Sequence, residues 1–79
     1  MEIQILFFGA VADSVKSRQL ILNVASGTTA AAAIETAKKE HPALASQKLL
    51  IAVNEEYADT DTILGDGDEV AVFTAVSGG

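Results

Sequence analysis

Apolar and polar residues alternate near both ends of the chain, and a period of two is typical of β-strands with one buried face. Residues 2–8, "EIQILFF", direct Ile3, Ile5 and Phe7 to one side. A second alternating segment runs from residue 69 to about 75 and directs Val70, Val72 and Thr74 to one side. Because both segments are strongly apolar, we expect them to be neighbours at the centre of a sheet.

Three further elements are predicted between these strands. Residues 18–26 read as a strand antiparallel to the first one, with residues 9–17 as the connecting loop. Residues 30–40 are good helix formers, with Thr28 or Thr29 as the N-cap. Pro42 ends this helix, because proline disfavours helical geometry at the residue before it.

The remaining strand is predicted at residues 48–58, with a turn near Asn54, and an Asp66-Gly67 turn precedes the last strand. The predicted helix has an inward stripe of unusually small volume, so it should lie close to its sheet. The stripe comprises Ala30, Ala33, Ile34 and Ala37, and His41 could extend it.

This element order predicts an α+β fold of the β-grasp type, with one main helix packed on one face of a mixed sheet of four to five strands. We expect residues 1–75 to form the domain and residues 76–79 to form an extended C-terminal tail. The N-terminus has no basic residue before its apolar stretch and reads as a strand rather than a signal peptide.

Composition narrows the functional classes. The 79 residues include no cysteine, which excludes a disulfide framework, a thiolate metal site and a cysteine nucleophile. The net charge of −6 argues against nucleic acid as a partner and suits a basic protein partner. No apolar run approaches the roughly 20 residues of a membrane span, so we expect a cytoplasmic protein without membrane contact.

The sequence shows no motif for catalysis or metal binding. It lacks a phosphate-binding glycine loop, and its single histidine, His41, lies at a helix end where a structural role is expected. An EF-hand loop begun at Asp59 would have Ile63, Leu64 and Val70 where oxygen, glycine and glutamate are required. We therefore expect no metal site, and a solvated acidic edge formed by Asp59, Asp61, Asp66, Asp68 and Glu69.

Two features point to a function in protein contacts. If the first and last strands are central, Leu6, Phe8, Ala71 and Phe73 all fall on the sheet face opposite the helix, where an apolar patch usually marks an interface. The chain then ends in "TAVSGG". Five extended residues reach about 17 Å, far enough to enter another protein's active site. A tip of Gly78 and Gly79 is thin and leaves its carboxylate unobstructed.

These motifs resemble those of the ubiquitin-like sulfur carriers of bacteria and archaea, and within them the small subunit of molybdopterin synthase, the MoaD type. The resemblance covers the whole chain, and its most specific parts are "LGDGDEVAVF" and the terminal "VSGG". Other matching pieces are "ILFFG", "GTT", "HPAL" and "LLIAVNEEY". The chain departs from the family in its small helix alanines and in having Thr74 and Ala75 where prolines are common.

The resemblance implies a cycle of sulfur transfer in which the carrier binds no cofactor itself. A ubiquitin-activating-type adenylyltransferase would use ATP to adenylate the carboxylate of Gly79, and a sulfur donor protein would convert the adenylate to a thiocarboxylate. Val76, Ser77, Gly78 and Gly79 would then insert into the large subunit of molybdopterin synthase, in a two-plus-two heterotetramer. There sulfur would pass to cyclic pyranopterin monophosphate, and the catalytic groups would belong to the large subunit.

Three alternatives remain open at this point. The chain could be a related carrier serving thiamine, cysteine or tRNA thiolation. It could be a protein modifier that joins Gly79 to a lysine. It could also be a β-grasp interaction module with an inert tail.

Overall fold

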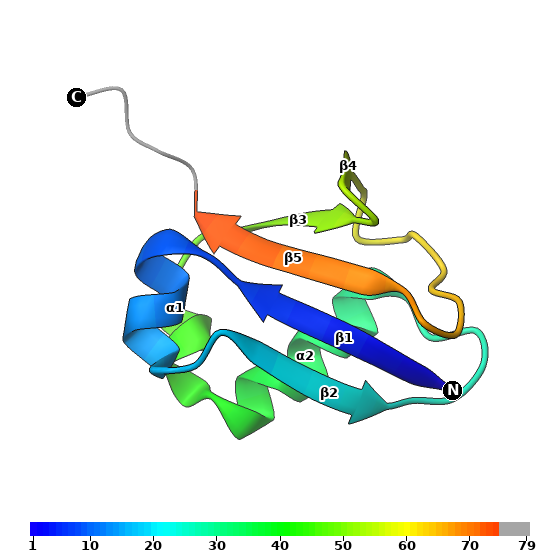
Figure 1. Cartoon of the computed structure of the whole chain (residues 1–79), viewed down its shortest axis with the longest axis horizontal. Helices are drawn as coiled ribbons and strands as arrows, with labels where there is room; N and C mark the ends of the chain where they lie inside the picture. The colour runs from blue at the N-terminus through cyan, green and yellow to red at the C-terminus, as the bar shows by residue number, and fades with distance from the viewer. Residues whose placement is uncertain (75–79) are drawn as a thin grey trace.

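The computed structural model describes residues 1–74, which form a five-stranded sheet covered on one face by helix (Figure 1). The strands lie in the order β2-β1-β5-β3-β4, and β1 and β5 are parallel whereas the other pairs are antiparallel. The strands are β1 (Glu2–Phe7), β2 (Gln19–Asn23), β3 (Leu49–Val53), β4 (Glu56–Tyr57) and β5 (Glu69–Thr74). The mixed sheet confirms the predicted α+β architecture.

The first and last strands are central, as the alternation predicted. Ile5 of β1 pairs with Val70 of β5 on one side and with Leu20 of β2 on the other. The side chains that this register directs toward the helices are fully or almost fully buried. They are Ile3, Ile5, Phe7, Val70 and Val72.

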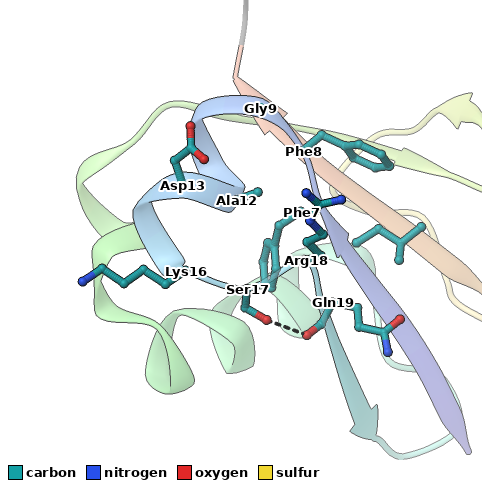
Figure 2. Close-up of a pocket in the computed structure, with 10 residues that line it drawn as sticks. Phe7, Phe8, Gly9, Ala12, Asp13, Lys16, Ser17, Arg18 and Gln19 are labelled. Carbon is teal, nitrogen blue, oxygen red and sulfur yellow. Dashed lines mark hydrogen bonds between the residues drawn. The ribbon is translucent and has the colours of Figure 1, made fainter.

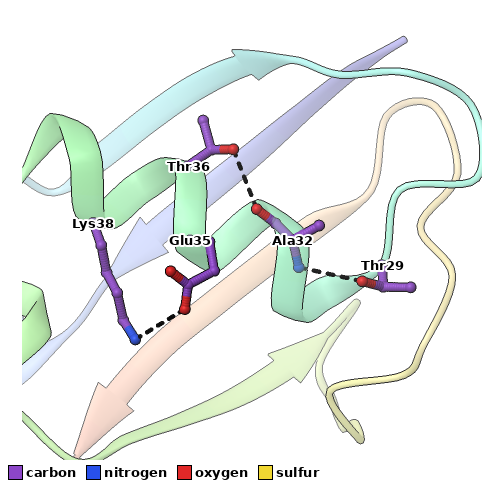
Figure 3. Close-up of polar contacts among 5 residues, drawn as sticks. All are labelled: Thr29, Ala32, Glu35, Thr36 and Lys38. Atoms are coloured by element: carbon purple, nitrogen blue, oxygen red, sulfur yellow. Dashed lines mark hydrogen bonds and ion pairs between the residues drawn. The ribbon is translucent and has the colours of Figure 1, made fainter.

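The main helix, α2 (Ala30–Glu40), begins and ends where the sequence predicted. The Thr29 hydroxyl accepts a hydrogen bond from the Ala32 N–H at 3.2 Å, which satisfies one of the free donors of the first turn (Figure 3). Pro42 starts the 3-10 helix η1 (Pro42–Ser46) directly after α2. The His41 ring packs edge-on against the Phe7 ring, with 5.5 Å between ring centroids, which is the structural role expected for this histidine.

The prediction of a loop at residues 9–17 is wrong, because Gly9–Val15 form the helix α1. Val11 of this helix is completely buried and anchors it to the core. The helix lacks the usual sequence signals, since Phe8 provides no capping side chain and the left-handed C-cap is Lys16 (φ 57°) rather than glycine. Gly9 itself has φ 55°, a conformation that glycine adopts at little cost where the chain turns from β1 into α1.

The small inward side chains of α2 give a test of how tightly the helix packs on the sheet. Ala33 has no exposed surface, and a leucine there is expected to lower the free energy of unfolding by about 1–3 kcal/mol through overpacking. Ala32, one residue earlier, is exposed, so Ala32→Leu is the matched control and should change stability by less than about 0.5 kcal/mol. Urea denaturation of both variants measures the difference. Equal effects at the two positions would contradict tight packing.

Candidate functional site

The sheet face opposite α2 carries a continuous set of apolar side chains, which we call the outer face. These residues alternate along the strands with the buried ones, so the pleat directs them away from the helix. Phe8 is 51% exposed, Leu50 38% and Tyr57 83%, which is unusual for large apolar or aromatic side chains. The outer face comprises Leu6, Phe8, Ile21, Leu50, Ala52, Tyr57, Ala71 and Phe73.

The structure brings together the side chains predicted as an interface. Leu6 lies directly beside Ala71 in the parallel ladder, and Phe73 lies opposite Leu50 in the antiparallel one. Phe73 also packs against the Tyr57 ring, with centroids 5.9 Å apart. Sequence reasoning missed Ile21, Leu50, Ala52 and Tyr57. For the last three, the signal was the alternation on either side of Asn54, where the structure has a turn with positive φ.

The outer face extends to the end of β5, from which the rest of the chain continues. Phe73 is the last outer-face residue of β5, and Thr74 after it pairs with Leu49. The predicted tail residues, Val76, Ser77, Gly78 and Gly79, lie outside the described residues, as does Ala75. Their insertion into a partner and the reaction at Gly79 stay predictions.

A hollow of about 810 Å³ lies next to the outer face, between α1 and the ends of β1 and β2 (Figure 2). Leu6 and Phe8 belong both to its wall and to the outer face, and Lys16 and Arg18 add two cationic side chains. The Phe8 N–H donates a hydrogen bond to the Val72 carbonyl at 3.1 Å, which places this wall beside the end of β5. The hollow therefore combines apolar groups with two cations and the carboxylate of Asp13, close to the end of β5.

The opposite end of the sheet holds Asp66, Asp68 and Glu69, and the carboxylates of Asp66 and Asp68 accept hydrogen bonds around the turn before β5. The Asp68 carboxylate accepts hydrogen bonds from the Gly65 N–H at 2.7 Å and from the Asn54 amide at 3.0 Å. The backbone bond from Gly65, and then the bond from Asn54, lower the pKa of Asp68. Within residues 1–74 no three carboxylates or histidines are grouped so as to hold a metal ion.

The hydrogen bonds of Asp68 make stability depend on pH in acid. Because its pKa is lowered on folding, the stabilisation is present above the ordinary pKa of about 3.9 and is lost as the pH falls through the folded value. Asp68→Ala should lower the free energy of unfolding by about 1 kcal/mol at pH 7, and the difference from wild type should shrink below about pH 4. Asp61→Ala, at an exposed position, is the control. A difference that stays constant down to pH 2 would contradict this account.

The helices among residues 1–74 are all too short or too polar to span a membrane. The outer face and the adjoining hollow are the two surfaces that stand out, and both reach the end of β5.

Comparison with known proteins gives a consistent result. Residues 5–79 match the ThiS family. The chain is 33% identical over 82 residues to the molybdopterin synthase sulfur carrier subunit of Mycobacterium tuberculosis, covering 100% of this chain and 99% of that one. SAMP1 from Haloferax volcanii, a small archaeal modifier protein, has a TM-score of 0.91, 27% identity and full coverage of both chains.

One solved neighbour comes from a complex. It is from the protein–protein complex of subunits 1 and 2 of molybdopterin-converting factor from Helicobacter pylori, with a TM-score of 0.72, 24% identity and full coverage of both chains. At that identity the likeness concerns the fold alone. Together the structural neighbours confirm the predicted ubiquitin-like β-grasp fold.

Proposed function

The chain belongs to the ThiS family, and from this we propose that it is a sulfur carrier for molybdenum cofactor biosynthesis, with sulfur bound at Gly79 as a thiocarboxylate. The observation that carries the proposal is the full-length similarity to the molybdopterin synthase sulfur carrier subunit of Mycobacterium tuberculosis. A sulfur carrier of this type accounts for a chain without cysteine, since the sulfur is bonded to the C-terminal carbon. Because the proposed cycle consumes ATP, we propose that it takes place in the cytoplasm.

The proposed chemistry needs an activated carboxylate, because a carboxylate ion is a poor electrophile. An oxygen of the Gly79 carboxylate attacks the α-phosphorus of ATP on the adenylyltransferase, and pyrophosphate leaves. Hydrosulfide, or an equivalent from a sulfur donor protein, then attacks the acyl carbon and AMP leaves. In the transfer, the thiocarboxylate sulfur bonds to a side-chain carbon of cyclic pyranopterin monophosphate, which loses an oxygen substituent. Water then cleaves the resulting thioester, so that the sulfur stays on the pterin side chain and the Gly79 carboxylate is restored.

The outer face is the surface we propose for docking to the large subunit of molybdopterin synthase. The Helicobacter pylori neighbour was solved in a complex of the two subunits of molybdopterin-converting factor. In the present chain, Phe73 lies next to the last residue of β5, so a protein that covers the outer face is also within reach of the tail. Aromatic side chains in such a position are the usual centre of an interface. A two-plus-two heterotetramer is the expected assembly.

Related functions share the same activation step. The family match also suits carriers for thiamine, cysteine or tRNA thiolation, in which only the acceptor differs. The similarity to SAMP1 favours a second candidate, a protein modifier that forms an isopeptide bond between Gly79 and a lysine. Isolation of the chain from cells separates the two, because a modifier would be found attached to other proteins.

The experiment that tests the proposal is intact-mass spectrometry after incubation with ATP, sulfide and extract of the source cells. A gain of about 16 Da is expected, because sulfur replaces one oxygen of the C-terminal carboxylate. When the thiocarboxylate form of the chain is added to the purified large subunit, cyclic pyranopterin monophosphate should be converted to molybdopterin. An unchanged mass in an extract that thiolates a known carrier would overturn the proposal.

A further inference from the structure

The charges of this chain are segregated between the two ends of its sheet. The chain has five basic residues, and all lie at the end where β5 finishes, which we call the tail end. Lys48 directly precedes Leu49, which pairs with Thr74, the last residue of β5. The basic residues are Lys16, Arg18, Lys38, Lys39 and Lys48.

The other four cations reach the tail end through different elements. The Phe7 N–H donates a hydrogen bond to the Arg18 carbonyl at 2.9 Å, so Arg18 lies beside the end of β1, and Lys16 caps α1 at the same end of the sheet (Figure 1). Lys38 and Lys39 belong to the last turn of α2, which the ring contact between His41 and Phe7 holds beneath the end of β1.

Six of the eleven acidic residues lie at the opposite end. Asp68 and Glu69 lie beside Gln4 where β5 begins, and the Glu2 N–H donates a hydrogen bond to Asp66 at 2.8 Å. Glu55 and Glu56 follow the end of β3, which is again the end where β5 begins. Asp13, Glu35 and Glu40 belong to the two helices that also carry cations, and within residues 1–74 only Glu35 forms an ion pair, with Lys38 at 3.4 Å. Asp59 and Asp61 line a hollow with Leu49 and Leu50 at the other edge of the sheet.

The two ends of the sheet are far enough apart that an approaching protein interacts mainly with the charges of the nearer end. The six residues of β5 span about 20 Å, whereas charges in water are screened over about 8 Å at physiological ionic strength. Among residues 1–74, a protein that approaches the tail end therefore meets five cations against the carboxylates of Asp13, Glu35 and Glu40, although the whole chain has a net charge of −6. The expectation of a basic partner was based on the net charge of the whole chain and stays a prediction, whereas the charges at this end suggest an acidic surface.

We propose that the tail end docks against an acidic protein surface, with carboxylates that surround the channel receiving Gly79. This inference rests on the proposed function and adds the charge of the partner to it. Arg18 and Lys48 are exposed and lie on the two sides of β5, toward β2 and β3. Arg18 also lines the hollow with Phe8, where a partner carboxylate can accept two hydrogen bonds from the guanidinium while apolar groups cover the phenyl ring (Figure 2).

Charge reversal at the tail end tests this inference through the rate of association with the purified large subunit of molybdopterin synthase from the same organism. In stopped-flow measurements at about 50 mM NaCl, Arg18→Glu/Lys48→Glu should slow association by about 10-fold or more. The difference should fall below about 2-fold at 1 M NaCl, where screening acts within roughly 3 Å. Arg18→Gln/Lys48→Gln should associate at a rate between those of the wild type and Arg18→Glu/Lys48→Glu. This variant replaces the double glutamate variant in the test if the glutamates disturb folding.

The matched control reverses two charges at the acidic end. Glu2→Lys/Glu56→Lys changes the net charge by the same amount in the opposite sense, at exposed positions. It should leave the association rate within about 2-fold of wild type, because these positions lie beyond the screening length from the tail end. If the association rate of this control rose by as large a factor as it falls in Arg18→Glu/Lys48→Glu, net charge alone would control the rate. That result would overturn the inference.

An unchanged or faster association of Arg18→Glu/Lys48→Glu would also overturn the inference. The proposed function is tested separately by the mass gain of the wild-type chain. If the wild type gains about 16 Da while charge reversal has no effect on association, the acidic partner surface is wrong and the sulfur carrier stands. If the wild type gains no mass, the proposed function fails whatever the charge variants do.

Discussion

Deletion of Gly79 should abolish sulfur loading of the chain, with at least a 100-fold loss in the rate of the mass gain. The shortened chain ends on the carboxylate of Gly78, which is chemically the same group. It stops about 3.5 Å short of the reacting position, however, because each extended residue spans 3.3–3.6 Å. Displacement of a reacting group by about 1 Å already costs around 100-fold in rate. Intact-mass spectrometry after incubation with ATP, sulfide and extract provides the measurement.

Loss of folding is not expected to explain this result. The buried core extends from Ile3 to Val72, so removal of the last residue leaves every core side chain in place. Ser77→Ala keeps the length of the chain and serves as the matched control, with sulfur loading expected within about 3-fold of wild type. Equal loading of the chain without Gly79 would show that position along the tail does not matter. The assignment of Gly79 as the sulfur-bearing residue would then be wrong.

Phe73→Asp should weaken binding to the large subunit of molybdopterin synthase by about 30-fold or more, corresponding to roughly 2 kcal/mol. Phe73 lies on the outer face against Leu50 and Tyr57, immediately before the end of β5. A carboxylate there would lose the aromatic contact and would be desolvated without a partner when the surface is covered. Isothermal titration calorimetry measures the dissociation constant, and Phe73→Ala should give a smaller loss in the same direction.

The control for this prediction is a second exposed apolar residue that lies away from the outer face. Ile63 is 68% exposed and forms a bridge with Thr29 at the start of α2, outside the strands of the sheet. Ile63→Asp should bind the large subunit with nearly wild-type affinity. Circular dichroism reports whether each variant is folded. A folded Phe73→Asp chain with unchanged affinity would exclude the outer face as the docking surface.

The parts of the fold that follow from local pattern were predictable from the sequence. The alternation in β1 and β5 placed Leu6 and Phe73 on the face opposite the helix, and Thr29 and Pro42 marked the limits of α2. Each of these inferences uses residues close together in the chain. The helix α1 was missed because burial of Val11 stabilises it, and that burial depends on contacts with residues far away in sequence.

The candidate site was predictable only in part for the same reason. Leu6, Phe8, Ala71 and Phe73 could be grouped once the central strands were known, but Tyr57 required the position of the turn at Asn54. The charge segregation had no local signal. Lys16, Lys38 and Lys48 belong to separate segments, and the pairing of strands and the direction of α2 bring them to one end.

The pairing of β1 with β5 also determines when the protein can fold during its synthesis. Ile5 needs Val70 as its neighbour, so the central pair is incomplete until 65 further residues have been added. At the usual rate of 5–20 residues per second, the nascent chain carries its apolar first strand without this partner for about 3–13 s. A chain released before β5 would lack the centre of its sheet and the glycines that follow it. Translation therefore completes the centre of the sheet only when its last strand has been added.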